Sequence, residues 1–441
     1  MSNESQEEVD QREPWQKNPE FNLGLVIVIS LGFFTTSVWS FYNSQVQLAL
    51  NDLFGNLFLV AFIMTVDNII GVVLQPYTGS LSDRTKTKFG RRMPFLMIGV
   101  PISAASFFLL GITKDNPVLY ILVILVFCTS MAFWRAPIVA LMPDFVHPRD
   151  RTKGNAIVNV LGGIGTAILS LIGGMIIEVN YALAFGVLAI VMIIAFLVLF
   201  LTVKEPDTRR WDFSELKDEE TGKEPGLIDN LRKIWNEEDK SMVYMLLAIF
   251  CWFITYNTSE SLIAIYAQTF FDSAPSQASF LVTVTALAFL AFAYFSVKLA
   301  GKYGRRKTIM LGLIIWTISF IIGSLFEGAE NFVYFYLIVL GMGVGWACIN
   351  INSIAMVWAM APNEKSTGVY TGLYYSASFI SQIAGPLTFG FIFEYIWGLR
   401  YMLAILSILL VAAFICMSRV TRGEVQDHVP DDPARAEAEA I

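Results

Sequence analysis

Twelve long apolar runs divide this chain of 441 residues, and each run is long enough to cross a lipid bilayer. About 20 helical residues span the roughly 30 Å of bilayer hydrocarbon. Only 15% of the residues are charged, whereas an ordinary globular domain carries about 25%. The sequence therefore predicts an all-α membrane protein with twelve transmembrane helices. The runs cover residues 21–44, 54–80, 91–112, 117–142, 152–177, 181–203, 241–270, 276–298, 306–326, 330–359, 364–393 and 398–418.

One long polar stretch, residues 204–240, separates the first six runs from the last six. Within it, apolar residues recur at helical spacing over 227–235. This short helix could lie at the membrane interface, or it could pack on cytoplasmic loops. The expected parts of the chain are a tail at 1–20, a six-helix bundle at 21–203, a linker at 204–240, a second six-helix bundle at 241–418 and a tail at 419–441.

The positive charges are distributed very unevenly across the predicted membrane. Of the 30 Lys and Arg residues, all but Lys114, Arg135 and Arg400 lie on the side of the two tails. Cytoplasmic loops carry the excess of Lys and Arg in membrane proteins. We therefore expect both termini to be cytoplasmic, in a multi-pass protein of the plasma membrane (the inner membrane of the cell). No cleavable signal peptide is expected.

Two short motifs recur at one fixed distance. Residues 90–92 (Gly-Arg-Arg) return as residues 304–306, which is 214 positions later. Residues 151–154 (Arg-Thr-Lys-Gly) correspond at the same offset to residues 365–368 (Lys-Ser-Thr-Gly). The shared offset predicts a duplicated unit, hence two pseudo-symmetric bundles with a substrate site between them near the membrane midplane. The second copy is degenerate, because Gly301 stands where Asp83 would be.

The first of these motifs belongs to a longer pattern. Residues 79–84 (Gly-x-x-x-Asp-Arg) followed by residues 90–92 resemble the signature loop of the major facilitator superfamily. The string from Gln75-Pro76 to Pro94-Phe95, and the block from Arg135-Ala136 to Asn155-Ala156, are similar to the sucrose–proton symporters. Residues 67–71 (Asp-Asn-x-x-Gly) are similar to the second helix of the glycoside–pentoside–hexuronide cation symporters. The resemblance implies the major facilitator fold and the symport of a sugar with a cation.

Two acidic positions of those families are apolar in this chain. Residues 121–125 contain no acid, whereas the plant sucrose transporters carry one in that stretch of the fourth helix. Ile63 stands where the cation-coupled sugar family has a further acid, one turn before Asp67. The identity of the coupling ion, H⁺ or Na⁺, therefore stays open.

Three charged residues inside the apolar runs are candidates for ion coupling and substrate coupling. Asp67 lies near the middle of the second run and Glu260 within the seventh. A carboxylate in hydrocarbon faces a cavity, finds a partner or protonates, so both are candidate ion-coupling residues. Arg135 in the fourth run could clamp substrate hydroxyls or hold a carboxylate in its charged form. The structural alternatives are a hydrogen-bonding role for Asp67, a helix break at Glu260 and a structural ion pair for Arg135.

Sugars need paired hydrogen-bonding groups and flat apolar faces, and the membrane runs offer both. Each such residue could instead serve only in helix packing. Besides Arg135, the candidate substrate-binding residues are Trp39, Gln45, Gln75, Asn257, Asn350, Asn352, Tyr374 and Gln382.

The basic loop after the second run suggests a gate. Asp83 can face the positive end of a neighbouring helix and pair with Arg91 or Arg92. We expect such a latch only when the cytoplasmic sides of the two bundles are closed. Topology alone would explain the basic residues but not the acid. The candidate gating residues are Asp83, Arg84, Gly90, Arg91, Arg92, Asp144 and Arg151.

Several classes of function lack the residues that they need. The four cysteines all lie in apolar runs and the two histidines lie in predicted loops, so we expect no metal site and no Ser-His-Asp chemistry. No Gly-x-x-x-x-Gly-Lys-Ser/Thr string occurs, which argues against ATP-driven pumping. We expect no enzyme, no cofactor and no nucleic-acid partner.

Together, these features predict a secondary active transporter that works as a monomer. Its expected substrate is a glycoside or disaccharide, sucrose- or maltose-like, carried with a proton by alternating access. One alternative is a Na⁺-coupled symporter, or an exporter, of another small solute with the same fold. A second alternative is a membrane sensor that does not transport.

Overall fold

The computed structural model describes residues 22–146, 151–205, 232, 234–236, 238–361 and 367–424. Within these residues all regular structure is helical, and 12 helical segments are long and apolar enough to cross a membrane. The prediction of an all-α membrane protein with twelve spans is therefore confirmed. The short helix predicted at 227–235 falls largely outside the described residues, as do both tails.

The chain forms two compact units. The first consists of Met1–Tyr42 and Val66–Glu224, and the second consists of Asn43–Thr65 and Pro225–Ile441. Two helices, α3 (Val38–Phe54) and α4 (Leu57–Arg84), therefore contribute residues to both units. The remaining helices of the first unit are α2 (Leu23–Phe34), η1 (Thr35–Ser37), α5 (Met93–Thr113), α6 (Pro117–Phe145), α7 (Arg151–Ile177) and α8 (Tyr181–Thr202). Those of the second unit are α10 (Ser241–Phe271), α11 (Pro275–Tyr303), α12 (Arg305–Gly323), η5 (Ala329–Asn331), α13 (Phe332–Met360), α14 (Thr367–Tyr395), η7 (Leu399–Tyr401) and α15 (Met402–Ser418).

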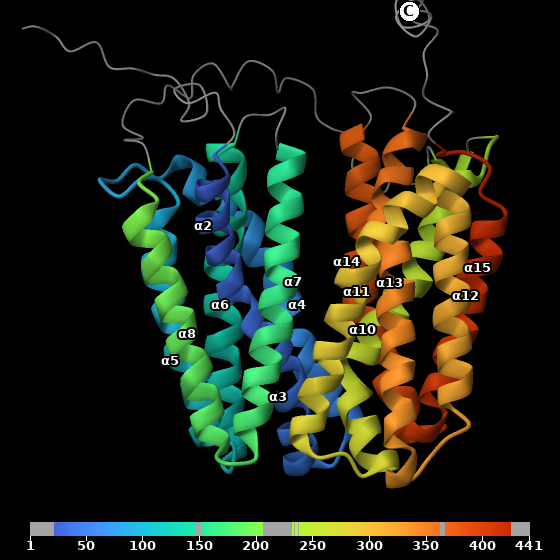
Figure 1. The fold of residues 1–441 in the computed structure, drawn as a ribbon, viewed down its shortest axis with the longest axis horizontal. Coiled ribbons are helices and arrows are strands. Elements are labelled where there is room, and N and C mark those ends of the chain that lie inside the picture. The colour runs from blue at the N-terminus through green and yellow to red at the C-terminus, as the bar shows by residue number, and fades with distance from the viewer. Residues whose placement is uncertain are drawn as a thin grey trace, which may run out of the picture. The chain divides into compact units, whose positions relative to one another are not determined.

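The same helix pairings occur in both units. In the first unit α5 packs against α6 and α8, and α2 packs against α7 and α8 (Figure 1). In the second unit α12 packs against α13 and α15, and α10 packs against α14 and α15. The third and ninth spans, α5 and α12, thus hold equivalent places. This recurrence is the pseudo-symmetry that the repeated motifs predicted.

The predicted end of the first span, at residue 44, is wrong. The helix continues to Phe54, and the turn to α4 follows at Gly55, whose φ of 56° suits a residue without a side chain. The polar residues Asn43, Ser44, Gln45 and Gln47 have hydrogen-bond partners inside the second unit. Gln45, for example, is buried and donates from Nε2 to Ser279 Oγ at 2.8 Å and to the Pro275 carbonyl oxygen at 2.7 Å. A buried amide with hydrogen-bond partners is compatible with a membrane helix.

The beginning of α4 is also fixed by the second unit. The backbone N–H of Leu57 donates to Glu394 Oε2 at 2.8 Å, and the Asn56 side chain donates to the Tyr395 hydroxyl at 3.0 Å. A carboxylate near the first N–H groups of a helix satisfies donors that have no partner within the helix. Residues 43–65, which we call the outer segment, are therefore attached to α10, α11 and α14 by side-chain hydrogen bonds, and Phe58 also packs on Phe391 of α14.

Candidate functional site

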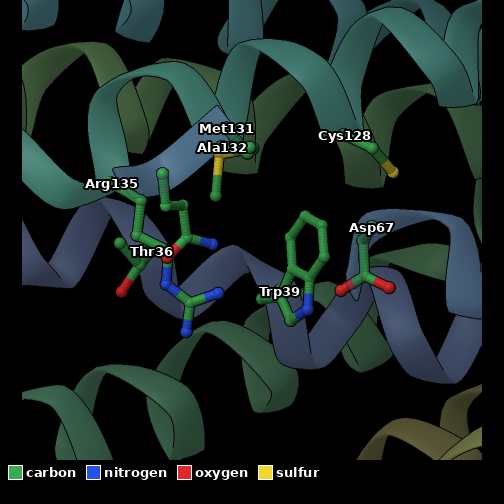
Figure 2. Close-up of a pocket in the computed structure, with 8 residues that line it drawn as sticks. Thr36, Trp39, Asp67, Cys128, Met131, Ala132 and Arg135 are labelled. Atoms are coloured by element: carbon green, nitrogen blue, oxygen red, sulfur yellow. The ribbon is translucent and has the colours of Figure 1, made fainter. Parts of the chain in front are cut away.

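A cavity in the first unit brings together four of the predicted functional residues. They are Trp39 of α3, Asp67 and Gln75 of α4 and Arg135 of α6; Figure 2 labels Trp39, Asp67 and Arg135. The cavity volume is about 70 Å³, below the roughly 300–1,000 Å³ of pockets that enclose a drug-sized ligand. The first unit by itself therefore offers room for water or for part of a small solute.

The two charged residues lie at different levels of this cavity. Asp67 is close enough to Tyr42 and Cys128 to interact electrostatically with both. Arg135 follows Cys128 by seven residues along α6, which is a rise of about 10 Å. Figure 2 shows the Trp39 ring between Asp67 and Arg135. The cavity thus has an acidic end and a basic end, with an indole between them.

The indole of Trp39 is held by neighbouring aromatic rings. It stacks on Tyr42 with ring centroids 4.9 Å apart and on Phe127 with centroids 5.3 Å apart. The Tyr42 hydroxyl lies 3.6 Å from Cys128 Sγ in a hydrogen bond. Stacked aromatic side chains restrict one another, so Trp39 presents a well-positioned flat face to the cavity.

Arg135 differs from the arginines at the end of its own unit. Within the described part of the chain, its guanidinium has neither an ion-pair nor a hydrogen-bond partner, and the side chain is exposed to the cavity. A guanidinium carries five N–H donors in a fixed planar arrangement. These donors can bind hydroxyl or carboxylate oxygens of a solute.

The cavity also contains residues that the sequence did not single out: Thr36, Cys128, Met131 and Ala132. Cys128, Met131 and Ala132 precede Arg135 by seven, four and three positions, which places them on the same face of α6. Thr36 lies one helical turn before Trp39. Helical spacing from the two predicted residues could have found all four.

Glu260, the second predicted ion-coupling residue, lies in the second unit on α10. Its Oε1 accepts a hydrogen bond from Asn43 Nδ2 at 2.8 Å, and its backbone carbonyl accepts one from Gln47 Nε2 at 3.0 Å. The structure therefore places Glu260 with the outer segment, within the second unit. Asn43 and Gln47 were missed by the sequence analysis, although their spacing of four puts them on one helix face.

The remaining predicted substrate residues lie in the second unit, and several are engaged in local contacts. Asn352 Nδ2 donates to Ser296 Oγ and to the Cys348 carbonyl, both at 2.8 Å. Asn257 donates to the Phe253 carbonyl at 2.7 Å. Hydrogen bonds also join the side chains of Tyr374 and Ser353 at 3.1 Å, and those of Gln382 and Ser378 at 3.1 Å. The backbone carbonyl of Asn350 accepts a hydrogen bond from the Ser353 hydroxyl at 3.2 Å. Of the predicted sugar contacts, Gln75 and Trp39 line the cavity of Arg135 within the first unit.

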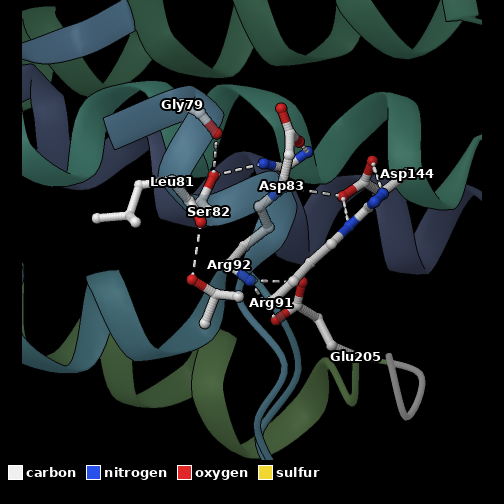
Figure 3. Close-up of polar contacts among 9 residues, drawn as sticks. Gly79, Leu81, Ser82, Asp83, Arg91, Arg92, Asp144 and Glu205 are labelled. Carbon is white, nitrogen blue, oxygen red and sulfur yellow. Dashed lines mark hydrogen bonds and ion pairs between the residues drawn. The ribbon is translucent and has the colours of Figure 1, made fainter. Parts of the chain in front are cut away.

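The predicted gating residues form an ion-pair cluster at the end of the first unit that carries the basic loop (Figure 3). Arg91 Nη2 lies 2.6 Å from Asp144 Oδ1, and Arg92 Nε lies 3.1 Å from Asp144 Oδ2. Arg92 also pairs with Asp83 at 2.5 Å and donates to the Ser82 hydroxyl. Asp144 therefore joins both arginines, whereas Asp83 contacts one of them. Their role as a gate stays a prediction.

Two further charged gating candidates are Arg84 and Arg151. The side chain of Arg84 is exposed, and the side chain of Arg151 lies outside the described residues. Gly90 has a φ of 103°, a backbone conformation that glycine adopts readily. A Cβ at this position would also lie 2.2 Å from the side chain of Glu205. Gly90 is thus required both by the turn and by the close approach of an acid.

That acid, Glu205, was not predicted from the sequence. It follows α8, and its carboxylate accepts the backbone N–H of Arg92 at 2.9 Å (Figure 3). It also accepts the backbone N–H of Met93 at 2.8 Å, at the start of α5. Burial raises the pKa of Glu205 from 4.5 to about 7, the two N–H bonds oppose that rise, and the charge of Asp144 adds to it. Glu205 therefore titrates near neutral pH.

The second unit repeats this acidic cap. The carboxylate of Glu424, after α15, accepts the backbone N–H groups of Arg305 at 2.8 Å and Arg306 at 3.0 Å, at the start of α12. The guanidinium of Arg306 donates to the Met417 carbonyl at 3.1 Å. The degenerate repeat thus keeps the cap while carbonyl oxygens take the place of acids. An acid just after the last span of each half was the signal that could have revealed both caps.

The chain is similar to known proteins over most of its length. The family model of the Major Facilitator Superfamily matches residues 28–274 and 262–440. The tetracycline resistance protein, class B, of Escherichia coli is 22% identical over 328 residues, covering 74% of this chain and 77% of that protein. The sucrose transport protein SUC3 of Arabidopsis thaliana is 27% identical over 129 residues, covering 24% of this chain and 22% of that protein.

Solved structures with similar folds include the nucleoside transporter NupG. Its crystal structure aligns with a TM-score of 0.69 at 14% sequence identity, covering 90% of this chain and 99% of that one. At this identity the similarity shows the fold alone.

Proposed function

The chain belongs to the Major Facilitator Superfamily of transporters, and on this premise we propose that it is a secondary active transporter that carries a glycoside together with a proton. The observation that carries the proposal is the cavity shared by Asp67, Trp39 and Arg135. Proton-coupled sugar transport needs three kinds of group. They are a carboxylate that can exchange a proton, an aromatic face, and a guanidinium with available donors.

Each residue has a separate role in this proposal. Asp67 binds the proton, because a carboxylate at membrane depth is most stable when neutral or paired. Trp39 packs against the apolar face of a sugar ring. Arg135 and Gln75 donate hydrogen bonds to hydroxyl oxygens. The choice of a sugar over other solutes is supported by the partial similarity to a sucrose transport protein.

Coupling follows from thermodynamic linkage between the two sites. If protonation of Asp67 favours sugar binding, sugar binding must favour protonation by the same free energy. Sugar affinity should then weaken as the external pH rises through the pKa of Asp67. The carrier works by alternating access as a monomer in the plasma membrane, with the Asp83–Arg92–Asp144 cluster on the cytoplasmic side together with both termini.

Uptake into proteoliposomes tests this proposal directly. Purified protein would be assayed with a panel of labelled mono- and disaccharides under an imposed pH gradient or Na⁺ gradient. We expect one or more sugars to accumulate when the outside is acidic, and Asp67→Asn to abolish that accumulation. Asp115→Asn, which removes an exposed carboxylate from the loop between α5 and α6, should accumulate sugar like the wild type. If a Na⁺ gradient drives accumulation and a pH gradient does not, the coupling ion is Na⁺ and not a proton.

Export of another small solute is the second candidate function. It is favoured by the class B tetracycline resistance protein, whose similarity extends over 328 residues. In this case sugars would not accumulate, and a labelled drug would leave preloaded vesicles when an inward proton gradient is imposed. Ligand binding without any turnover would instead favour a sensor that does not transport.

A further inference from the structure

The backbone at the end of the loop between α4 and α5, residues 85–92, is held by the carboxylate of Glu205. Glu205 accepts the N–H of Arg92 with both oxygens, at 2.9 and 3.0 Å, and that of Met93 at 2.8 Å. The α5 helix has no side-chain cap of its own at Arg92. Glu205 therefore supplies the anionic partner for the first N–H groups of α5.

The shape of the loop makes this attachment specific. The Thr87 hydroxyl donates to the Gly90 carbonyl at 2.7 Å, and the Gly90 N–H donates to the Thr87 carbonyl at 3.1 Å, which closes a tight turn. Gly90 leaves the space that the Glu205 side chain occupies, because a Cβ there would lie 2.2 Å from it. The Phe89 ring packs near Phe200 of α8 at 6.1 Å. The turn and the carboxylate thus fit together as one docked arrangement.

The charges around Glu205 are opposed. Arg92, at the start of α5, favours the ionised carboxylate, whereas Asp144 of α6 disfavours it. Both arginines of the loop are already paired, Arg91 with Asp144 and Arg92 with Asp144 and Asp83. The partly buried Glu205 carboxylate therefore adds a further negative charge to a cluster that has little positive charge to spare.

We propose that Glu205 makes the docking of the 85–92 loop depend on pH on the loop's side of the membrane, with acid favouring the docked loop. Protonation removes the repulsion from Asp144 and the cost of burying a charge, and the protonated carboxyl still offers its carbonyl oxygen to a backbone N–H. Glu205 is thus a positioning residue for the signature loop, distinct from the proton site proposed at Asp67.

The sign and size follow from linkage. The docked carboxyl titrates at a pKa of about 7 and a carboxyl released into water at its ordinary 4.5, so the docked loop binds more protons between those values. The docked-to-released ratio must therefore rise as the pH falls from about 8 to about 5. Between pH 7.5 and pH 6.0 these two values give a rise of roughly eightfold.

Amide hydrogen exchange measures the docking without any transport assay. Protection factors of the Arg92 and Met93 amides would be measured in the full-length protein at pH 6.0 and 7.5, each relative to an unstructured peptide of the same sequence. This reference removes the intrinsic effect of pH on exchange. We expect protection to be roughly eightfold higher at pH 6.0. Because no solute is involved, failure of the proposed sugar transport would leave this result unaffected.

Three variants assign the effect to Glu205. Glu205→Gln mimics the neutral acid, so protection should be high and equal at both pH values. Glu424→Gln, the matched change at the cap of α12, should leave the pH dependence at Arg92 and Met93 intact. Gly90→Ala should lower protection at both pH values, because its Cβ displaces Glu205. Wild-type protection that is equal at pH 6.0 and 7.5, or pH dependence that persists in Glu205→Gln, would overturn the proposal.

Discussion

The Asp144 carboxylate should matter more for the stability of the first unit than the Asp83 carboxylate, although Asp83 is the acid of the signature loop. The side chain of Asp144 is 16% exposed, and its arginine partners Arg91 and Arg92 are 12% and 6% exposed. Removing one member of a buried ion pair typically costs about 3–5 kcal/mol, because a charge is left without its partner. Arg92 keeps Asp83 and Ser82, so we expect Asp144→Asn to cost about 2–4 kcal/mol.

Asp83 presents the opposite case. Its side chain is 51% exposed and, among the described residues, forms its ion pair with Arg92; exposed ion pairs contribute about 0.2–1 kcal/mol. The apparent melting temperature of the purified protein in one detergent would rank the variants. We expect a clearly larger decrease for Asp144→Asn than for Asp83→Asn, and almost none for the loop variant Asp115→Asn. An equal or larger decrease for Asp83→Asn would show that burial does not set the energies of this cluster.

A double-mutant cycle separates the pairwise interaction from other effects. Arg91→Gln combined with Asp144→Asn should lower the melting temperature by less than the two single changes together, because both remove the same interaction. Strict additivity would mean that the 2.6 Å contact between Arg91 and Asp144 contributes no net stability.

Two changes test the transport residues, and a third tests the attachment of the outer segment. Asp67→Asn should abolish sugar accumulation in proteoliposomes but keep downhill exchange, since an amide cannot cycle a proton; undiminished accumulation would remove Asp67 from the mechanism. Arg135→Lys should raise the KM for sugar about tenfold or more, because lysine lacks the planar set of donors; an unchanged KM would show that charge alone suffices. Asn43→Ala, which removes the bond to Glu260, should increase maleimide labelling of a Ser44→Cys reporter several-fold, and equal labelling would contradict a role in holding the outer segment.

The helices could be predicted because each must satisfy its own backbone inside lipid, so long apolar runs leave few alternatives. The end of the first span could not. Beyond residue 44 the run contains Gln45 and Gln47, whose amides are accommodated by partners such as Ser279 and Glu260, more than 200 positions away. A span that ends in polar residues thus depends on long-range partners that local sequence does not contain.

The candidate site could be predicted only in part. Asp67 and Arg135 are conspicuous charges in apolar runs, and the structure places both in one cavity. Glu260 was equally conspicuous but lies with Asn43 in the other unit. Glu205 was missed because it stands at the start of a polar linker, where an acid is unremarkable in sequence. Its importance comes from the backbone N–H groups of Arg92 and Met93, and backbone donors carry no signal in the amino-acid sequence.

The attachment of the outer segment also has a consequence for how the chain is made. Asn43, Gln45 and Leu57 leave the ribosome early, but their partners Glu260, Ser279 and Glu394 follow 217, 234 and 337 residues later. At roughly 5–20 residues per second, the first two helices wait about 10–70 s for these partners. During that interval their amide groups must be shielded by water, by headgroups or by an insertion factor. A chain divided in the linker would therefore not yield two self-sufficient halves, because the earliest helices to be synthesised are among the last to reach their native contacts.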